Sequence, residues 1–329
     1  MSAEILGNMS KHRRIAVFAL AGILIAAVFV LVFAILPGLS GDNKRSDLFA
    51  QDSNGMPSRL NAELAVLKAA YPSITIASTF DSQIGDWKIT MTKGGSTKDL
   101  YWAEGRYLPK ELLASKDNYR TLIFYIPKKP EDPSTFKKEQ IEKIREFGSS
   151  ESRESAPVSP TSFFEIIYNT SSREDLEAHI VKTKFLGRQV NVHELIVEPL
   201  KRVESKILSI SRTDEQVRDF IQSIGSIDGY SWRQIRDTSG MSFHSMGLAI
   251  DILPRGWQDK IVYWNWEKNK GNDDWMLIPL EDRWAPPDLV VDIFEDEGFV
   301  WGGKWTVWDN MHFEYRPEMI LGRDVAERD

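Results

Sequence analysis

The chain has 329 residues, no cysteine and a formal net charge of −7 at pH 7. The lack of cysteine excludes a disulfide framework and thiolate metal sites, and the acidic balance argues against nucleic acid as a partner. Apolar residues make up 42% and charged residues 27% of the sequence, which is typical of a globular protein with two modest domains or one large one.

The first predicted element is an uncharged apolar run at residues 15–36. As a helix it would be about 33 Å long, enough to cross a bilayer core of about 30 Å. Basic residues precede the run, so the positive-inside rule places residues 1–14 in the cytoplasm and the rest of the chain outside. A cleaved signal peptide is the alternative, but its apolar region is shorter and ends at a small-x-small site. We therefore expect a single transmembrane anchor over residues 15–37.

The next 147 residues divide into a tether and an accessory region. Residues 38–58 are rich in Ser, Gly, Asp and Asn, which favours a tether off the membrane. Residues 59–184 are expected to form an α/β region that is a separate accessory domain or an N-terminal elaboration of the domain that follows. The expected elements are helices at 61–70, 136–147 and 163–168, strands at 74–76, 87–91 and 121–126, and a flexible, Ser-rich loop at 148–162.

Residues 185–329 show stronger helix signals. A helix is expected at 194–210, and a second one opens at a capping box formed by Thr213 and Gln216. A third helix begins at Pro286 and Pro287 and ends at Gly298. Its inward residues are expected to be Leu289, Val290, Ile293 and Phe294, and short strands follow at 299–301 and 311–315. Helices followed by short strands indicate the α+β class.

Two blocks in this part carry potential metal ligands. Residues 242–251 read SFHSMGLAID and residues 309–314 read DNMHFE. Residues seven apart on a regular strand point to opposite faces, so His244 and Asp251 converge only if the chain turns between them, and Gly247 is the natural turning point.

The residue types in these blocks are those of a catalytic zinc site. His244, Asp251 and His312 would supply two imidazoles and one carboxylate, and three protein ligands leave one position open, as in catalytic rather than structural zinc sites. Asp309 lies three residues before His312 and is placed to take the proton of an attacking water. This chemistry is that of amide hydrolysis.

The two blocks, together with the Trp-Gly-Gly-Lys-Trp run at 301–305, resemble the M15 peptidoglycan metallopeptidases. That family includes D-alanyl-D-alanine carboxypeptidases and L-alanyl-D-glutamate endopeptidases. The resemblance is close from residue 229 to 316, extends back to residue 185 and does not cover residues 42–180. It implies a small antiparallel sheet with packed helices around the zinc site, an architecture shared with hedgehog-like domains.

The resemblance implies one zinc ion per chain, bound by His244, Asp251 and His312, with Asp309 as general base and acid. Some relatives carry Glu at the position of Asp309 and other branches carry Asp, so we do not expect inactivation. The family also uses an arginine that stabilises the oxyanion or holds a substrate carboxylate. Arg233, which follows a Gly-Tyr pair, is the predicted counterpart.

Four further residues are candidates for substrate contact or for support of the ligands: Arg236, Ser242, Glu314 and Trp305. Arg236 is the reserve for Arg233. Ser242 is expected to support the loop, and Glu314 to accept a hydrogen bond from a ligating histidine.

Nine of the eleven tryptophans lie between residues 232 and 308. Most are expected to form the core of a small domain. Trp257, Trp264 and Trp266 lie between the two ligand blocks and are candidates for lining a groove and stacking on sugar faces.

The sequence thus predicts a membrane-anchored zinc peptidase that acts on peptidoglycan stem peptides outside the cytoplasmic membrane. D-alanyl-D-alanine carboxypeptidase activity is favoured. An endopeptidase that cleaves the L-alanyl-D-glutamate bond or a cross-link is the first alternative. A non-catalytic, zinc-containing cell-wall binding or sensing module is the second.

Overall fold

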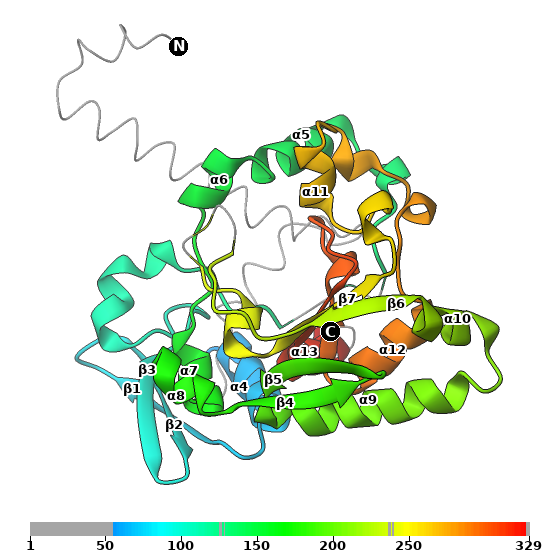
Figure 1. The fold of residues 1–329 in the computed structure, drawn as a ribbon. Coiled ribbons are helices and arrows are strands. Elements are labelled where there is room, and N and C mark those ends of the chain that lie inside the picture. Colours follow the sequence, from blue (N-terminus) through cyan, green and yellow to red (C-terminus); the bar gives the residue numbers. More distant parts are fainter. Residues whose placement is uncertain (1–54, 125–126, 128, 236–237, 239, 327–329) are drawn as a thin grey trace, which may run out of the picture.

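The computed structural model describes residues 55–124, 127, 129–235, 238 and 240–326. Three antiparallel sheets and the surrounding helices form an α+β fold (Figure 1), which confirms the predicted class. The predicted anchor at 15–37 lies outside the described residues. Within the described part of the chain, no helix combines the length and the apolar character needed to cross a bilayer.

The first sheet is a three-stranded meander that follows a helix. Apolar residues at alternate positions, Ile76 in β1, Ile89 and Met91 in β2 and Leu100 in β3, are buried on one face. The predicted helix and the first two predicted strands are therefore confirmed. The bounds are α4 Ser58–Ala70, β1 Thr75–Asp81, β2 Asp86–Lys93 and β3 Ser96–Tyr101.

The strand predicted at residues 121–126 is wrong over its described part. The backbone there makes isolated hydrogen bonds, from Leu122 N to Gly105 O (2.8 Å) and from Arg120 N to Val158 O (2.9 Å), in place of a continuous ladder. These bonds hold the segment between two loops. Its alternating apolar residues are therefore explained by local burial and not by a strand.

The flexible loop predicted at residues 148–162 is also wrong, because it contains helix α6 (Ser150–Ser155). The Ser149 hydroxyl accepts a hydrogen bond from Ser152 N and caps the helix. The same serines that favoured a loop in the sequence therefore begin a helix. The neighbouring helices are α5 Lys138–Phe147, α7 Ser162–Tyr168 and α8 Arg173–Glu177.

A hairpin of β4 (Ile180–Phe185) and β5 (Arg188–His193) was not predicted. Its two-residue turn places Leu186 and Gly187 at positive φ, 45° and 76°, in the conformation that suits the twist of a hairpin. The domain boundary expected between residues 184 and 185 lies inside β4. β5 packs beside β6, so the hairpin flanks the main sheet.

The main sheet has four antiparallel strands in the order β6-β7-β9-β8. Every residue of β7 is buried, as expected for a strand with a neighbour on each side and helices on its faces. Helices α9 and α12 lie on one side of the sheet, and α5, α6 and α11 lie beyond its other side (Figure 1). The strand bounds are β6 Ile224–Asp228, β7 Ala249–Pro254, β8 Phe299–Trp301 and β9 His312–Tyr315.

The predicted helices of this part are confirmed, with two corrections of detail. Asp214 caps α10 by accepting a hydrogen bond from Val217 N at 2.9 Å, so the capping box predicted at 213–216 is wrong. Leu289 is 40% exposed, and Val291 takes the buried position expected for it. The bounds are α9 Val197–Ile210, α10 Glu215–Ser223 and α12 Asp288–Asp296.

Tryptophan builds a second, smaller core beyond the main sheet. This cluster joins Ile144 of α5 to the insertion between β7 and β8, which contains α11 (Trp264–Asn269). Its other buried members are Trp264, Trp275, Met276, Ile278 and Trp308. This packing accounts for three of the nine tryptophans between residues 232 and 308.

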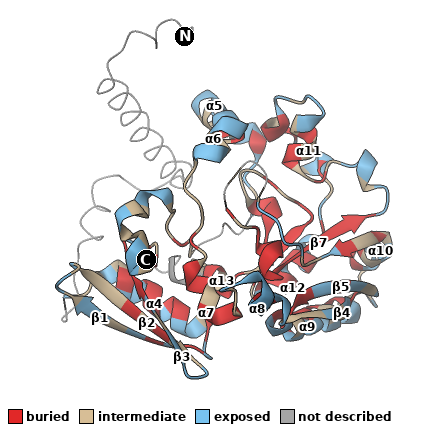
Figure 2. Ribbon diagram, turned by 60° about the vertical axis from the view of Figure 1, so that its left-hand side comes forward, coloured by how far each residue is buried: buried red, intermediate tan, exposed pale blue. Residues whose placement is uncertain are grey.

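The region before residue 185 shares one hydrophobic core with the C-terminal part. The main buried cluster runs from α4 through the meander and α7 to the main sheet. Helix α13 (Pro317–Ala326) packs against α4, and the buried residues of both helices and of α7 meet in the middle of the molecule (Figure 2). The two regions therefore fold against each other.

Candidate active site

His244 lies in a short 3-10 turn, Phe243–Met246, at one end of the main sheet. Ser242 begins the turn by accepting a hydrogen bond from His244 N at 3.3 Å, which is the loop-supporting position expected for it. Gly247 ends the turn with φ at +66°, and a Cβ atom there would lie 2.7 Å from His193 N. Only glycine fits this position, which turns the chain from His244 into β7.

Asp251 and His312 face each other across two paired strands. Asp251 in β7 is the direct register partner of His312 in β9. Residues directly opposite on an antiparallel pair have Cβ atoms about 4.5–5.5 Å apart, so the sheet brings these two side chains together. Both are buried, and a buried charge needs a compensating partner.

Three potential ligand atoms form a nearly equilateral triangle. His244 Nε2 lies 3.2 Å from His312 Nδ1 and 3.1 Å from Asp251 Oδ1, and His312 Nδ1 lies 3.0 Å from Asp251 Oδ1. A tetrahedral site with bonds of about 2.0–2.1 Å has ligand-to-ligand edges of roughly 3.3 Å. The triangle thus fits a metal ion, and His244, Asp251 and His312 are the residues that could hold it.

The electrostatics of the triangle also fit a cation. Burial would raise the pKa of Asp251, but the two histidines hold it well below its usual range. Burial would lower the pKa of His312, but Asp251 and Glu314 outweigh that effect and raise it to about 10. Without metal, the proton on His312 is a positive charge that helps to stabilise both Asp251 and Glu314.

We predict from this that metal binding releases a proton. His312 must lose its proton to become a ligand, so the apparent metal affinity should rise about tenfold per pH unit between its ordinary pKa of roughly 6.5 and about 10. Titration calorimetry in buffers of different ionisation enthalpy measures the released proton. An affinity independent of pH between 6.5 and 8 would contradict the prediction.

Both histidines are oriented through their second ring nitrogen. His244 Nδ1 lies 2.7 Å from the carbonyl oxygen of Gly229, and His312 Nε2 lies 3.1 Å from Glu314 Oε2. A Cβ atom on Gly229 would lie 2.2 Å from Asn191 O, so this close approach needs glycine. Such partners fix the ring orientation and the tautomer of metal-ligating histidines.

Behind Glu314 lies a chain of buried charged groups that the sequence analysis missed. Arg316 donates to Glu314 Oε1 (3.1 Å) and to Glu318, and Tyr71, directly after α4, donates to Glu318 Oε2 (2.6 Å). Residues 312, 314 and 316 alternate along one strand, a spacing that could have indicated Arg316. No local signal in the sequence points to Tyr71, which lies 247 residues before Glu318.

The second prediction concerns the support that Glu314 gives to the His312 ring. Glu314→Gln should weaken metal binding by roughly 10–100-fold, because a neutral amide orients and polarises the His312 ring less well. Competition with a fluorescent chelator measures the affinity. Glu198→Gln, in an exposed surface pair with Lys201, is the matched control and should leave it unchanged.

Asp309 lies beside the triangle, in the turn that precedes β9. Its carboxylate Oδ1 is buried and accepts no hydrogen bond within the described part of the chain. Burial and the charge of Asp251 raise the pKa of Asp309 to about 8. A carboxylate that titrates near neutral pH can both accept and return a proton.

These side chains open into one cavity of about 1130 Å³. Arg233 lines it from an exposed segment, and its positive charge acts on Asp309. Trp305 lines it with its ring centroid 5.3 Å from that of His312. Ser242 and Glu314 line it as well, whereas Arg236 lies outside the described residues. The structure therefore brings the potential ligands, Asp309, Arg233 and the described supporting candidates to one place.

The three tryptophan candidates differ in whether they line the cavity. Trp264 and Trp266 line the cavity, but Trp264 is almost fully buried. Trp257 packs on Trp266, with ring centroids 4.6 Å apart, and does not line the described cavity wall. Tyr263, which was not predicted, lines the cavity beside Asp309.

Comparisons with known proteins agree with this site. The model of a family described as D-alanyl-D-alanine carboxypeptidase, of the M15 peptidases, matches residues 235–315, which include all three potential ligands and Asp309. Residues 63–124 match the model of a domain of unknown function (DUF8518). Curated proteins and solved structures give no match. Residues 235–315 are therefore similar to the M15 peptidases, the family that the ligand motifs predicted.

Proposed function

We propose that this protein is a zinc metallopeptidase that hydrolyses stem peptides of peptidoglycan, with D-alanyl-D-alanine carboxypeptidase activity favoured. The observation that carries the proposal is the triangle of His244, Asp251 and His312 with Asp309 beside it, all in one large cavity. The description of the matching family supports the choice of substrate.

Each residue has a role in this proposal. A zinc ion held by the triangle would lower the pKa of a water molecule and polarise the scissile carbonyl. Asp309 accepts the proton of the attacking water and returns it to the leaving amine. Arg233 stabilises the negative charge that develops on the carbonyl oxygen, or holds a substrate carboxylate.

Two alternatives lead to different products. An endopeptidase would cleave the L-alanyl-D-glutamate bond or a cross-link in the same cavity. A non-catalytic binding module would need the metal site but no base, and the raised pKa of Asp309 and its free Oδ1 disfavour it.

We further propose that the domain works outside the cytoplasmic membrane, with the N-terminus in the cytoplasm. This rests on the apolar run at residues 15–37 and the basic residues before it. A single anchor and a tether would hold the site close to newly made cell wall.

Mass spectrometry of purified muropeptides tests the proposal. The full-length, zinc-loaded protein in detergent is incubated with them, beside the variants His244→Ala and Asp309→Ala. Loss of one D-alanine with the wild type alone supports a carboxypeptidase, and cleavage within the stem or a cross-link supports an endopeptidase. Unchanged muropeptides with folded, zinc-loaded protein would overturn the peptidase proposal.

A further inference from the structure

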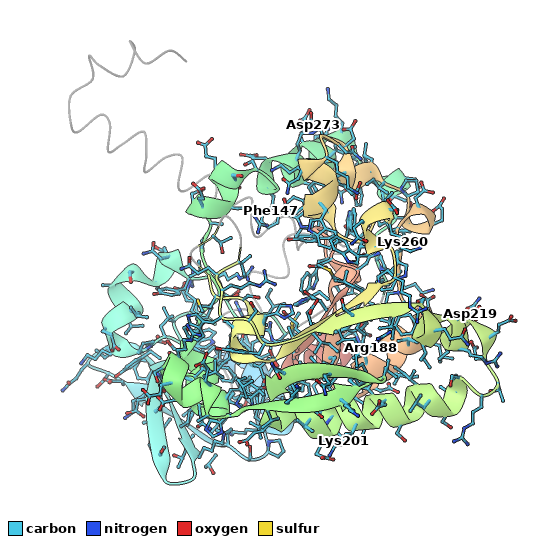
Figure 3. The ribbon with its side chains drawn as sticks, in the orientation of Figure 1. Phe147, Arg188, Lys201, Asp219, Lys260 and Asp273 are labelled. Carbon is cyan, nitrogen blue, oxygen red and sulfur yellow. The ribbon has the colours of Figure 1, made fainter. Side chains whose placement is uncertain are left out.

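One wall of the active-site cavity comes from outside the peptidase match. Residues 120–123 and most of residues 149–160 line the same cavity as His244 and Asp309. Phe147 at the end of α5 adds to this wall, whereas Lys201 and Asp219 lie on the outer surface (Figure 3). A substrate in the cavity would therefore contact the N-terminal region as well as the peptidase domain.

Arg120 is a charged group of this wall that interacts electrostatically with Arg316 and Glu314, the supports of the ligands. Its Nε donates to Ser159 Oγ at 2.7 Å, and its backbone N donates to Val158 O at 2.9 Å. The backbone bond fixes the segment and the Nε bond fixes one edge of the guanidinium, so that among the described residues the two terminal nitrogens are left for another partner. Among the described residues, no carboxylate forms an ion pair with Arg120.

The surroundings of Arg120 favour an anion. Burial lowers its pKa, and the positive charges of Arg316 and Arg153 lower it further, whereas Glu314 raises it. Glu314 is already bonded to His312 and Arg316, so it does not neutralise Arg120. A half-buried guanidinium among other cations is costly without an anionic partner, and its two free nitrogens match the two oxygens of a carboxylate.

Arg120 and Arg233 act on different groups of the site. Arg233 acts on Asp309 and Tyr263, whereas Arg120 acts on Glu314, behind His312. The two arginines share none of these partners. The two positions thus fit two separate groups of one peptide.

We propose that Arg120, held by Ser159, forms a carboxylate-binding subsite through which the N-terminal region sets substrate specificity. The proposal rests on the proposed peptidase function. The ligand is a carboxylate of the stem peptide, either the C-terminal one or that of the internal D-glutamate. The subsite gives the region around residues 63–124 a direct part in substrate selection.

Three peptides distinguish the two sources. They are L-Ala-γ-D-Glu-L-Lys-D-Ala-D-Ala, its C-terminal amide, and the form with D-isoglutamine in place of D-glutamate. Full-length, zinc-loaded wild type is compared with Arg120→Gln, Arg120→Lys and the control Arg145→Gln, whose arginine is paired with Asp274 on the surface, away from the cavity.

Arg120→Gln should lower kcat/KM for peptides that carry the recognised carboxylate by about 10–100-fold, mainly through KM. The one amide that lacks this group should be cleaved equally by wild type and variant. Arg120→Lys should retain part of the preference, and Arg145→Gln should behave as wild type. An equal loss on all three peptides, or no loss on any, would overturn the subsite.

Binding of the same peptides, followed by tryptophan fluorescence, separates this proposal from the proposed function. If the wild type cleaves none of them, the peptidase assignment fails, and the binding data still decide on Arg120. The subsite is supported if Arg120→Gln binds the peptide with the recognised carboxylate more weakly than the wild type does, but binds the amide form that lacks this carboxylate equally well. Equal affinities, or no binding to the wild type, overturn it.

Discussion

Replacement of Asp309 by asparagine is expected to lower kcat by about 10²- to 10⁴-fold, the contribution of a positioned general base. Asparagine has the same shape but cannot take a proton from the attacking water. Metal content and thermal stability should stay near those of the wild type, because Asp309 is outside the ligand triangle. Steady-state kinetics with metal analysis on the same sample checks both points.

The pH profile gives a second readout for Asp309. Its pKa of about 8 refers to the protein without metal, and a cation next to Asp251 lowers it. The base form is present above the pKa, so kcat/KM should rise with pH along a limb below about 8. Asp309→Asn should lose this limb along with the rate. A variant that keeps the wild-type rate would remove Asp309 from the mechanism and leave the proton transfer to another group.

The sequence was sufficient for those parts of the site that depend on local chain geometry. His244 and Asp251 lie on either side of one turning residue, and Gly247 turns the chain there as predicted. His312 and Glu314 share a strand face because side chains alternate, and the structure joins them by a hydrogen bond.

What the sequence could not provide depends on contacts between distant segments. Arg120 reaches the cavity because its segment is held by Val158 and Ser159, and neither pairing has a periodic signal. The apolar residues near it were misinterpreted as a strand for the same reason. Ser-rich composition likewise predicted a loop where a serine cap starts α6, since capping depends on the exact position of one hydroxyl.

These distant contacts link the N-terminal region to the metal ligands in two ways. Arg120 lines the substrate cavity, and Tyr71 reaches His312 through Glu318, Arg316 and Glu314. The Arg316 guanidinium is also packed over the ring of Phe243, 4.7 Å from its centroid, directly before His244. The region that precedes the peptidase match thus contributes to how the ligands are held.

Removal of His312 should have the largest effect of any substitution in this chain. His312→Ala deletes one ligand and the partner of both Asp251 and Glu314. Metal affinity should fall by more than the roughly 10–100-fold expected for a supporting residue, and activity with it. In the metal-free protein, two buried carboxylates each lose one partner, Asp251 keeping His244 and Glu314 keeping Arg316, at a cost of up to about 3–5 kcal/mol in the free energy of unfolding.

His312→Gln separates these two effects. Its amide can still donate to a neighbouring carboxylate, so part of the stability should return while metal binding and activity stay lost. His179→Ala, at a half-buried histidine paired with Glu194, is the control and should cost no more than about 1 kcal/mol. Chemical denaturation with and without metal gives both free energies. If His312→Ala kept its metal and its activity, the triangle would not be the metal site, because no site with two ligands from this set would hold the ion comparably.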